Sequence, residues 1–147
     1  MPCGKKRIYF EGVRVFVWNF GMFKKGAAMA VPRIGIFVGK NGISDQDLLK
    51  HEFGHILQYK KWGARKFWFK IAFVSVKSFR KEKKSASFRH YNTWTEWSAN
   101  RLAYNYFNKP NDWNFRDYPI LPKSFGKMSV PKFEKCPLLF VKKWIDC

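Results

Sequence analysis

The pentapeptide His51-Glu52-Phe53-Gly54-His55 constrains this chain more than any other segment. On a helix, the four-residue spacing places both imidazoles on one face, one turn apart. Two neutral imidazole nitrogens so placed can bind one Zn²⁺ at about 2.0–2.1 Å. Glu52 lies about 100° round the helix from His51, so its carboxylate can reach a water at the metal without being a ligand. We therefore predict a zinc site, the alternative being a surface helix on which these residues coincide.

The flanking residues support a helix over this motif. Ser44-Asp45-Gln46-Asp47 is typical of a helix start, with Ser44 as the cap and acidic residues in the first turn. Gly63 offers a C-terminal stop after Trp62. Gly54 costs about 1 kcal/mol in helix propensity, so we expect it to serve a purpose, which is to leave room beside the metal.

A catalytic zinc needs a third protein ligand and an open fourth position. Thr93-Trp94-Thr95-Glu96 is typical of a capping box and predicts a second helix that ends near Phe107. Glu96, in its first turn, is the leading candidate for the third ligand. The small residues Ala99 and Ala103 share its face and would let this helix pack closely against the first. The alternative is a capping glutamate with no metal role.

His90 and Tyr91 lie just before this second helix, on a loop that we expect to overhang the metal. Either side chain could donate a hydrogen bond to a developing oxyanion, and His90 could also replace Glu96 as the third ligand. Both could equally be ordinary loop residues. Gln58 shares the face of His51, where it would be a hydrogen-bond partner of the site or a surface amide.

At this point the layout resembles the gluzincin branch of the zincin metallopeptidases. The residues that carry the resemblance are His51–Gln58, Gly63, His90 and Thr95–Asn100, and it covers roughly Ile34–Phe107. These segments are similar to small bacterial proteins of metallopeptidase type. The resemblance implies one Zn²⁺, held by the ligands named above, with a water activated by the metal and by Glu52 as general base.

The resemblance also implies a partner for one of the zinc-bound histidines. Gluzincins often carry an acidic residue a few positions beyond the ligand glutamate, where it orients that histidine. Asn100 stands in this neighbourhood here. An amide can accept the imidazole N–H but brings no negative charge, so we expect it to tune the metal less strongly.

Strands are predicted before the first helix. Arg7–Trp18 is rich in Ile, Val, Phe and Tyr and contains a Glu11-Gly12 break, which predicts a bent strand or a tight hairpin. Val31–Gly39 predicts a second strand, and Pro32 favours a sheet edge because it cannot donate to a ladder. In the zincin arrangement an edge strand binds an extended peptide by strand addition. We assign to substrate binding the residues Arg33, Ile34, Gly35, Ile36 and Phe37.

The remaining segments complete an α+β prediction. Ala64–Phe79 has apolar residues at helical period, with a strand as the alternative, and a polar basic loop follows over Arg80–Arg89. From Pro110 onward the chain holds five of its seven prolines, which predicts an extended tail that wraps the body. We expect one zincin-like domain over residues 1–147, with a core at about 7–108, a short mixed sheet on the motif helix, a second ligand-bearing helix, and a tail over 109–147.

The net charge and the cysteine content limit the kinds of partner and site that we expect. The net charge is +19, which attracts an anionic partner such as nucleic acid, an anionic membrane or an acidic polymer. The tract Arg80–Lys84 is also typical of a solvated loop. Three cysteines without a Cys-x-x-Cys pattern argue against a disulfide framework and a cysteine zinc site, while a Cys136–Cys147 bridge stays open. We expect no secretory signal and no transmembrane segment, and the compartment stays open.

Three functions are compatible with these features. The leading hypothesis is a zinc-dependent metallopeptidase that hydrolyses peptide bonds in a peptide or protein substrate. The first rival is a non-catalytic module that binds nucleic acid or an anionic membrane through charge and aromatic side chains. The second is a metal-bearing toxin or interaction protein without turnover. Sixteen Phe and seven Trp exceed what a core of this size easily hides, so some should line a groove or face a partner.

Overall fold

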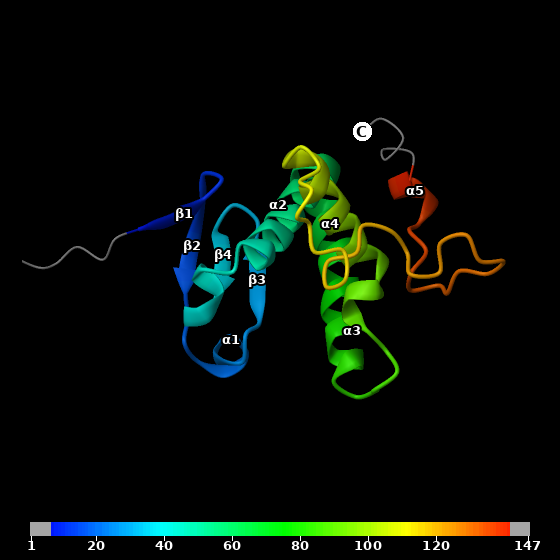
Figure 1. The fold of residues 1–147 in the computed structure, drawn as a ribbon, viewed down its shortest axis with the longest axis horizontal. Coiled ribbons are helices and arrows are strands. Elements are labelled where there is room, and N and C mark those ends of the chain that lie inside the picture. The colour runs from blue at the N-terminus through cyan, green and yellow to red at the C-terminus, as the bar shows by residue number, and fades with distance from the viewer. Residues whose placement is uncertain (1–6, 142–147) are drawn as a thin grey trace, which may run out of the picture.

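A computed structural model of the chain describes residues 7–141. It has an α+β fold in which a four-stranded mixed sheet packs against one long helical segment, with a further helix on the opposite side of that segment (Figure 1). The predicted α+β class is confirmed. Cys3 and Cys147 lie outside the described residues, and with them the Cys136–Cys147 pairing that the sequence left open.

The sheet is built from β1 (Ile8–Phe10), β2 (Val13–Val17), β3 (Ala28–Val31) and β4 (Gly35–Val38) in the order β1-β2-β4-β3. β1 and β2 form an antiparallel hairpin whose turn residues Glu11 and Gly12 have φ angles of 47° and 73°. The predicted hairpin is therefore confirmed. β2 pairs with β4 in parallel, and β3 pairs with β4 antiparallel.

The predicted edge strand is wrong in position. β4, which holds Gly35, Ile36 and Phe37, pairs with a strand on each side, and the edge next to it is β3. Pro32 instead belongs to the turn between β3 and β4, where the Ile34 N–H donates to the Val31 carbonyl at 3.0 Å and Arg33 has φ 72°. Proline at the second position and positive φ at the third define a type II turn. The missing N–H of Pro32 thus fits a turn rather than an edge.

The motif helix α2 (Gln46–Lys66) follows a short α1 (Gly21–Lys24) and a 3₁₀ turn, η1 (Lys40–Ile43). Its N-cap is Asp45, whose carboxylate accepts from the Leu48 N–H at 3.0 Å. The predicted Ser44 cap is wrong, because the Ser44 hydroxyl donates to the Asn41 carbonyl at 3.2 Å. Gly63 has φ 83° and ψ 164° and interrupts the helix, which confirms the predicted stop.

Beyond Gly63 the chain stays helical through η2 (Phe67–Ala72, a π-helix) and α3 (Phe73–Glu82). The helix predicted from Ala64 is confirmed and extends to Glu82, so Arg80 and Lys81 are helical rather than part of a loop. The later helices are η3 (His90–Asn92), α4 (Trp94–Tyr106) and α5 (Leu138–Val141).

α2 separates two apolar cores and is held by both. On the sheet side Phe53 and Ile56 pack with strand residues such as Ile36. On the other side Trp62 packs with Ile71 and with residues of α4 and the tail. Each fully buried large apolar side chain contributes about 1.5–3 kcal/mol, so the orientation of α2 about its axis is strongly fixed. The face of α2 that carries the histidines therefore has a fixed orientation.

The tail packs on α4. The Trp94 N–H donates to the Phe133 carbonyl and the Trp97 indole N–H to the Glu134 carbonyl, both at 2.8 Å. Within residues 7–141, no helix has the length and apolar character needed to cross a bilayer.

Candidate metal centre

Close packing of α2 on α4 brings the candidate ligands together. A Cβ added to Gly54 would lie 2.3 Å from the carbonyl oxygen of Ala99, and Ala99 and Ala103 are fully buried. The small-residue face predicted for α4 therefore does pack against α2. The expectation that Gly54 leaves room beside the metal is wrong, because the α4 backbone fills that space. Glycine serves helix packing here, and the packing places the site.

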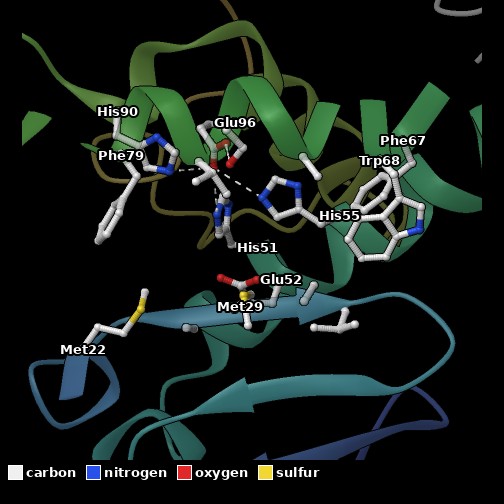
Figure 2. A pocket seen from close by; sticks show the side chains of 16 residues that line it. Met22, Met29, His51, Glu52, His55, Phe67, Trp68, Phe79, His90 and Glu96 are labelled. Carbon is white, nitrogen blue, oxygen red and sulfur yellow. Dashed lines mark hydrogen bonds and ion pairs between the residues drawn. The ribbon is translucent and has the colours of Figure 1, made fainter. Parts of the chain in front are cut away.

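Three ligand atoms converge between the two helices (Figure 2). His51 Nε2 and His55 Nε2 each lie 3.3 Å from Glu96 Oε2. All three atoms lie within 4.8 Å of one another. A tetrahedral site with bonds of about 2.0–2.1 Å has edges of about 3.3–3.4 Å. His51, His55 and Glu96 could thus hold one metal ion, as the sequence predicts.

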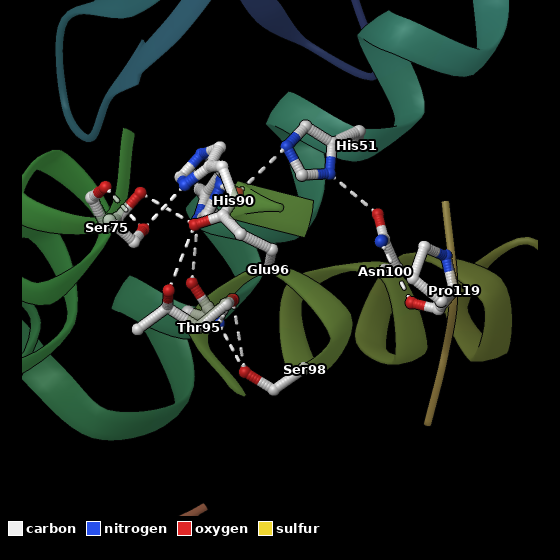
Figure 3. Close-up of polar contacts among 11 residues, drawn as sticks. His51, Ser75, His90, Thr95, Glu96, Ser98, Asn100 and Pro119 are labelled. Atoms are coloured by element: carbon white, nitrogen blue, oxygen red, sulfur yellow. Dashed lines mark hydrogen bonds and ion pairs between the residues drawn. The ribbon is translucent and has the colours of Figure 1, made fainter. Parts of the chain in front are cut away.

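The His51 ring is held by a hydrogen-bond relay from the tail (Figure 3). The Asn100 Nδ2 amide donates to the Pro119 carbonyl at 2.9 Å, which leaves its Oδ1 facing His51 Nδ1 at 2.6 Å. An amide oxygen only accepts, so Nδ1 carries the proton and the Nε2 lone pair points at the site.

The His55 ring is held in the same way by Gln58. The Gln58 amide donates to the Thr95 carbonyl and the Ser98 hydroxyl, both at 2.7 Å, so its Oε1 faces His55 Nδ1 at 2.8 Å. Gln58 is fully buried, which excludes the surface-amide alternative. In the neutral form of the His55 ring the proton is therefore also on Nδ1.

Glu96 turns away from the helix end and towards the histidines. Its Oε1 accepts from the Ser75 hydroxyl at 2.6 Å and from the Thr95 hydroxyl at 3.0 Å, which leaves Oε2 for the imidazoles. Thr93 is the N-cap residue of α4, but its side chain makes no capping hydrogen bond. The predicted capping box is thus absent, and the Glu96 side chain points in the direction that a metal ligand requires.

His90 adds a third imidazole to the same oxygen (Figure 3). Its Nε2 lies 3.3 Å from Glu96 Oε2. The Ser78 hydroxyl donates to the Ser75 carbonyl at 2.8 Å and lies 2.6 Å from His90 Nδ1, from which it accepts. The structure therefore brings His90 to the site. Tyr91 is 38% exposed and does not line the cavity at the site.

The electrostatics show how strongly this centre attracts positive charge. Burial alone would lower the pKa of His55, but the Glu96 carboxylate overrides it and raises that pKa to about 9. The same balance raises the pKa of His90. Burial opposes the ionisation of Glu96, yet His90 and His55 hold its pKa well below the usual range. In the absence of a metal, protons occupy the space among these groups.

A cavity of about 180 Å³ opens beside the ligands. One wall is the whole of edge strand β3, and the other is formed by η2 and α3 through Trp68, Val76 and Phe79. Glu52 is 5% exposed, and Figure 2 shows its carboxylate between the histidines and β3, near Met29. Glu52 thus lines the same cavity as the candidate ligands.

Sequence reasoning missed several residues of the centre. Ser75 and Ser78 lie four and seven residues beyond the buried Ile71, and hydroxyl groups at this helical spacing on a buried face could have marked them. Tyr118, whose ring centroid lies 5.4 Å from that of His51, follows from no pattern in the tail. Burial, and then the carboxylates of the neighbouring acidic residues, raise the pKa of Tyr118 and keep its hydroxyl protonated.

No protein-family model, curated protein or solved structure matches this chain. The likeness to gluzincins therefore depends on the arrangement itself: two histidines on one long helix and a glutamate on a later helix, buried together.

Proposed function

We propose that this chain is a zinc-dependent peptidase. The observation that carries the proposal is the convergence of three imidazole Nε2 atoms on Glu96 Oε2, while each Nδ1 lies 2.6–2.8 Å from an oxygen that can accept its proton. In their neutral form, rings held in this way present lone pairs to a negatively charged oxygen. That arrangement is unfavourable unless protons or a cation lie between them.

The donor set fits zinc. Two imidazole nitrogens and one carboxylate oxygen form the ligand set of a hydrolytic zinc site with an open position. We assign the ligands to His51, His55 and Glu96. When bound, the ion supplies a Lewis acid that polarises a carbonyl and lowers the pKa of a water. Asn100 and Gln58 support the ligands by fixing the orientation of the two rings.

The chain's own groups supply the proton transfers. Glu52 would accept the proton of the attacking water, since its carboxylate lines the cavity beside His51. His90 would donate from Nε2 to the oxyanion that develops on the substrate carbonyl, since its ring lines the cavity beside the ligands. Tyr91 does not line the cavity and has no role in this mechanism.

An extended substrate would bind along β3. Among residues 7–141, β3 pairs with β4 on one side only, so its other edge has backbone groups available for strand addition. Since all four of its residues line the cavity, a peptide added here would pass the candidate metal site. This assignment replaces the one based on β4.

A second candidate function follows from His90. Its Nε2 lies at the same 3.3 Å from Glu96 Oε2 as the two motif histidines do. If His90 bound the metal as a fourth protein ligand, the site would be closed and structural, as in a metal-bearing interaction protein.

Metal content and turnover, measured together, test the proposal. We expect about one zinc per purified chain, loss of most zinc in His51→Ala, and retained zinc in Glu52→Gln. Wild-type protein should cleave members of a peptide library, and Glu52→Gln should lower cleavage by several orders of magnitude. Zinc without cleavage in both proteins would favour the closed structural site, and absence of zinc from the wild type would refute the proposal.

A further inference from the structure

The outer face of the helix that forms one cavity wall is apolar and exposed. On η2 and α3, Phe69 is 74% exposed, Phe73 65%, Val76 49% and Trp68 43%. The inner face of the same helix is different, since Phe67 and Ile71 are buried in the core between α2 and α4. The exposed side chains therefore take no part in the core that the helix helps to form.

Positive charge surrounds these apolar side chains. Arg65, Lys66, Lys70, Lys77 and Arg80 are all exposed on the same helical segment. From Ala64 to Lys81 the sequence contains no Asp or Glu. We call this surface the aromatic-basic face, and it consists of Arg65, Lys66, Trp68, Phe69, Lys70, Phe73, Val76, Lys77 and Arg80.

We propose that the aromatic-basic face docks this protein on an anionic lipid bilayer. A helix lies in a membrane interface when its apolar side chains enter the acyl boundary and its basic side chains meet anionic headgroups. Long Lys and Arg stems extend past the apolar side chains and reach the headgroup level. The net charge of +19 draws the whole molecule to such a surface.

The chemistry of the exposed side chains favours lipid over nucleic acid. Nucleic-acid binding would use the rings as stacking platforms for bases. Val76 cannot stack, and neither can Met22 or Met29, which are 37% and 40% exposed across the cavity. Hydrocarbon, by contrast, accepts all of these side chains, because it requires only apolar surface.

The docking surface includes the mouth of the cavity. Trp68 and Val76 line the cavity from one side, and Met22 and Met29 line it from the other, as Figure 2 shows for Trp68 and the two methionines. Contact through both rims would turn the cavity towards the headgroups. If the proposed peptidase function holds, its substrates would be segments close to a membrane surface. The docking itself does not depend on catalysis.

Flotation of the full-length protein with vesicles tests the proposal. The probes are phosphatidylcholine vesicles with and without phosphatidylserine, at low and high salt. We expect binding only to the anionic vesicles, weakened by salt. Phe69→Ser with Phe73→Ser should reduce the partition coefficient at least about tenfold. Lys70→Ser with Lys77→Ser should reduce it by about fivefold for each lysine at low salt.

Matched controls remove comparable apolar surface and equal charge elsewhere. Phe125 and Leu138 are 70% and 76% exposed and line a different groove. Phe125→Ser with Leu138→Ser should leave vesicle binding unchanged. Lys123→Ser with Lys127→Ser, at two exposed positions, should weaken vesicle binding only slightly, through the lower net charge. Glu52→Gln should bind vesicles like the wild type, which separates docking from the proposed catalysis.

Two outcomes would overturn the proposal. Vesicle binding that survives loss of Phe69 and Phe73, or that falls equally in the control pairs, would show that net charge alone acts. Tight binding to a DNA duplex that is lost in the aromatic variants, with no binding to anionic vesicles, would assign the face to nucleic acid instead.

Discussion

The amide oxygen of Asn100 lies 2.6 Å from Nδ1 of His51, and its amide nitrogen donates to the Pro119 carbonyl. Asn100 therefore links a candidate metal ligand to the tail and determines which ring nitrogen is protonated. Outer partners of zinc-bound histidines typically change metal affinity about 10–100-fold.

Replacing Asn100 should show this effect directly. Asn100→Leu should weaken zinc binding about 10–100-fold, measured by competition with a chelator. Asn100→Asp should keep zinc, because a carboxylate accepts from His51, but it should lower thermal stability, since its second oxygen would face the Pro119 carbonyl without a proton to donate. Equal zinc affinity in wild type and Asn100→Leu would show that the relay does not act on the metal.

Substitutions of Glu96 and of His90 should have different effects on zinc content and turnover. Glu96→Ala should lose most bound zinc and some stability, because metal binding is coupled to folding. His90→Ala should keep zinc and lose mainly turnover. Metal content measured on both variants, with circular dichroism as the control for folding, decides between them. Zinc loss in His90→Ala with zinc kept in Glu96→Ala would indicate a site of three histidines.

The stability of the metal-free protein should fall over a pH window in which the stability of the zinc-loaded protein does not. The folded-state pKa of His55 is raised to about 9 from 6.5, so without metal its contribution is fully present below pH 6.5 and is lost as the pH rises through about 9. Zinc must displace this proton, so zinc affinity should rise over the same window. Denaturant unfolding at several pH values, with and without chelator, measures both slopes. Parallel slopes would contradict the shared site.

Gly54→Ala should destabilise the protein. In an open helix this change would stabilise by about 1 kcal/mol. Here the new Cβ would lie 2.3 Å from the Ala99 carbonyl oxygen, and overpacking of this kind costs about 1–3 kcal/mol. Because the clash pushes α4 from α2, zinc affinity should fall as well. A rise in the unfolding midpoint would mean that the helices can separate without cost.

The parts of this structure that the sequence predicted are those with local signals. The spacing of His51 and His55 needs only a helix, and Gly63 ends that helix through its own backbone preference. Glu96 could be proposed because a zinc site needs a third ligand. Its true partners could not, since Ser75 reaches it from the helix beyond the break at Gly63, 21 residues away along the chain.

The errors have a common physical origin. Ala28–Val31 is short and rich in small residues, so no alternation marks it as β3, and the edge was assigned to the neighbouring strand. Pro32, which suggested a sheet edge, belongs to the turn between β3 and β4 instead. Tyr118 and Pro119 reach His51 through tertiary packing of a tail without periodicity, which no local pattern encodes.

The backbone break at Gly63 affects the geometry of the site. The helix that bears His51 and the helix that bears Ser75 are two arms of one continuous segment joined at this residue. A Cβ at Gly63 would touch nothing within 4 Å, so only its dihedral angles, at φ 83°, restrict substitution there. The dihedral angles of Gly63 set the direction in which the second arm leaves the first. The width of the cavity between β3 and α3 and the 2.6 Å hydrogen bond from Ser75 to Glu96 therefore both depend on one backbone turn that lies outside the site.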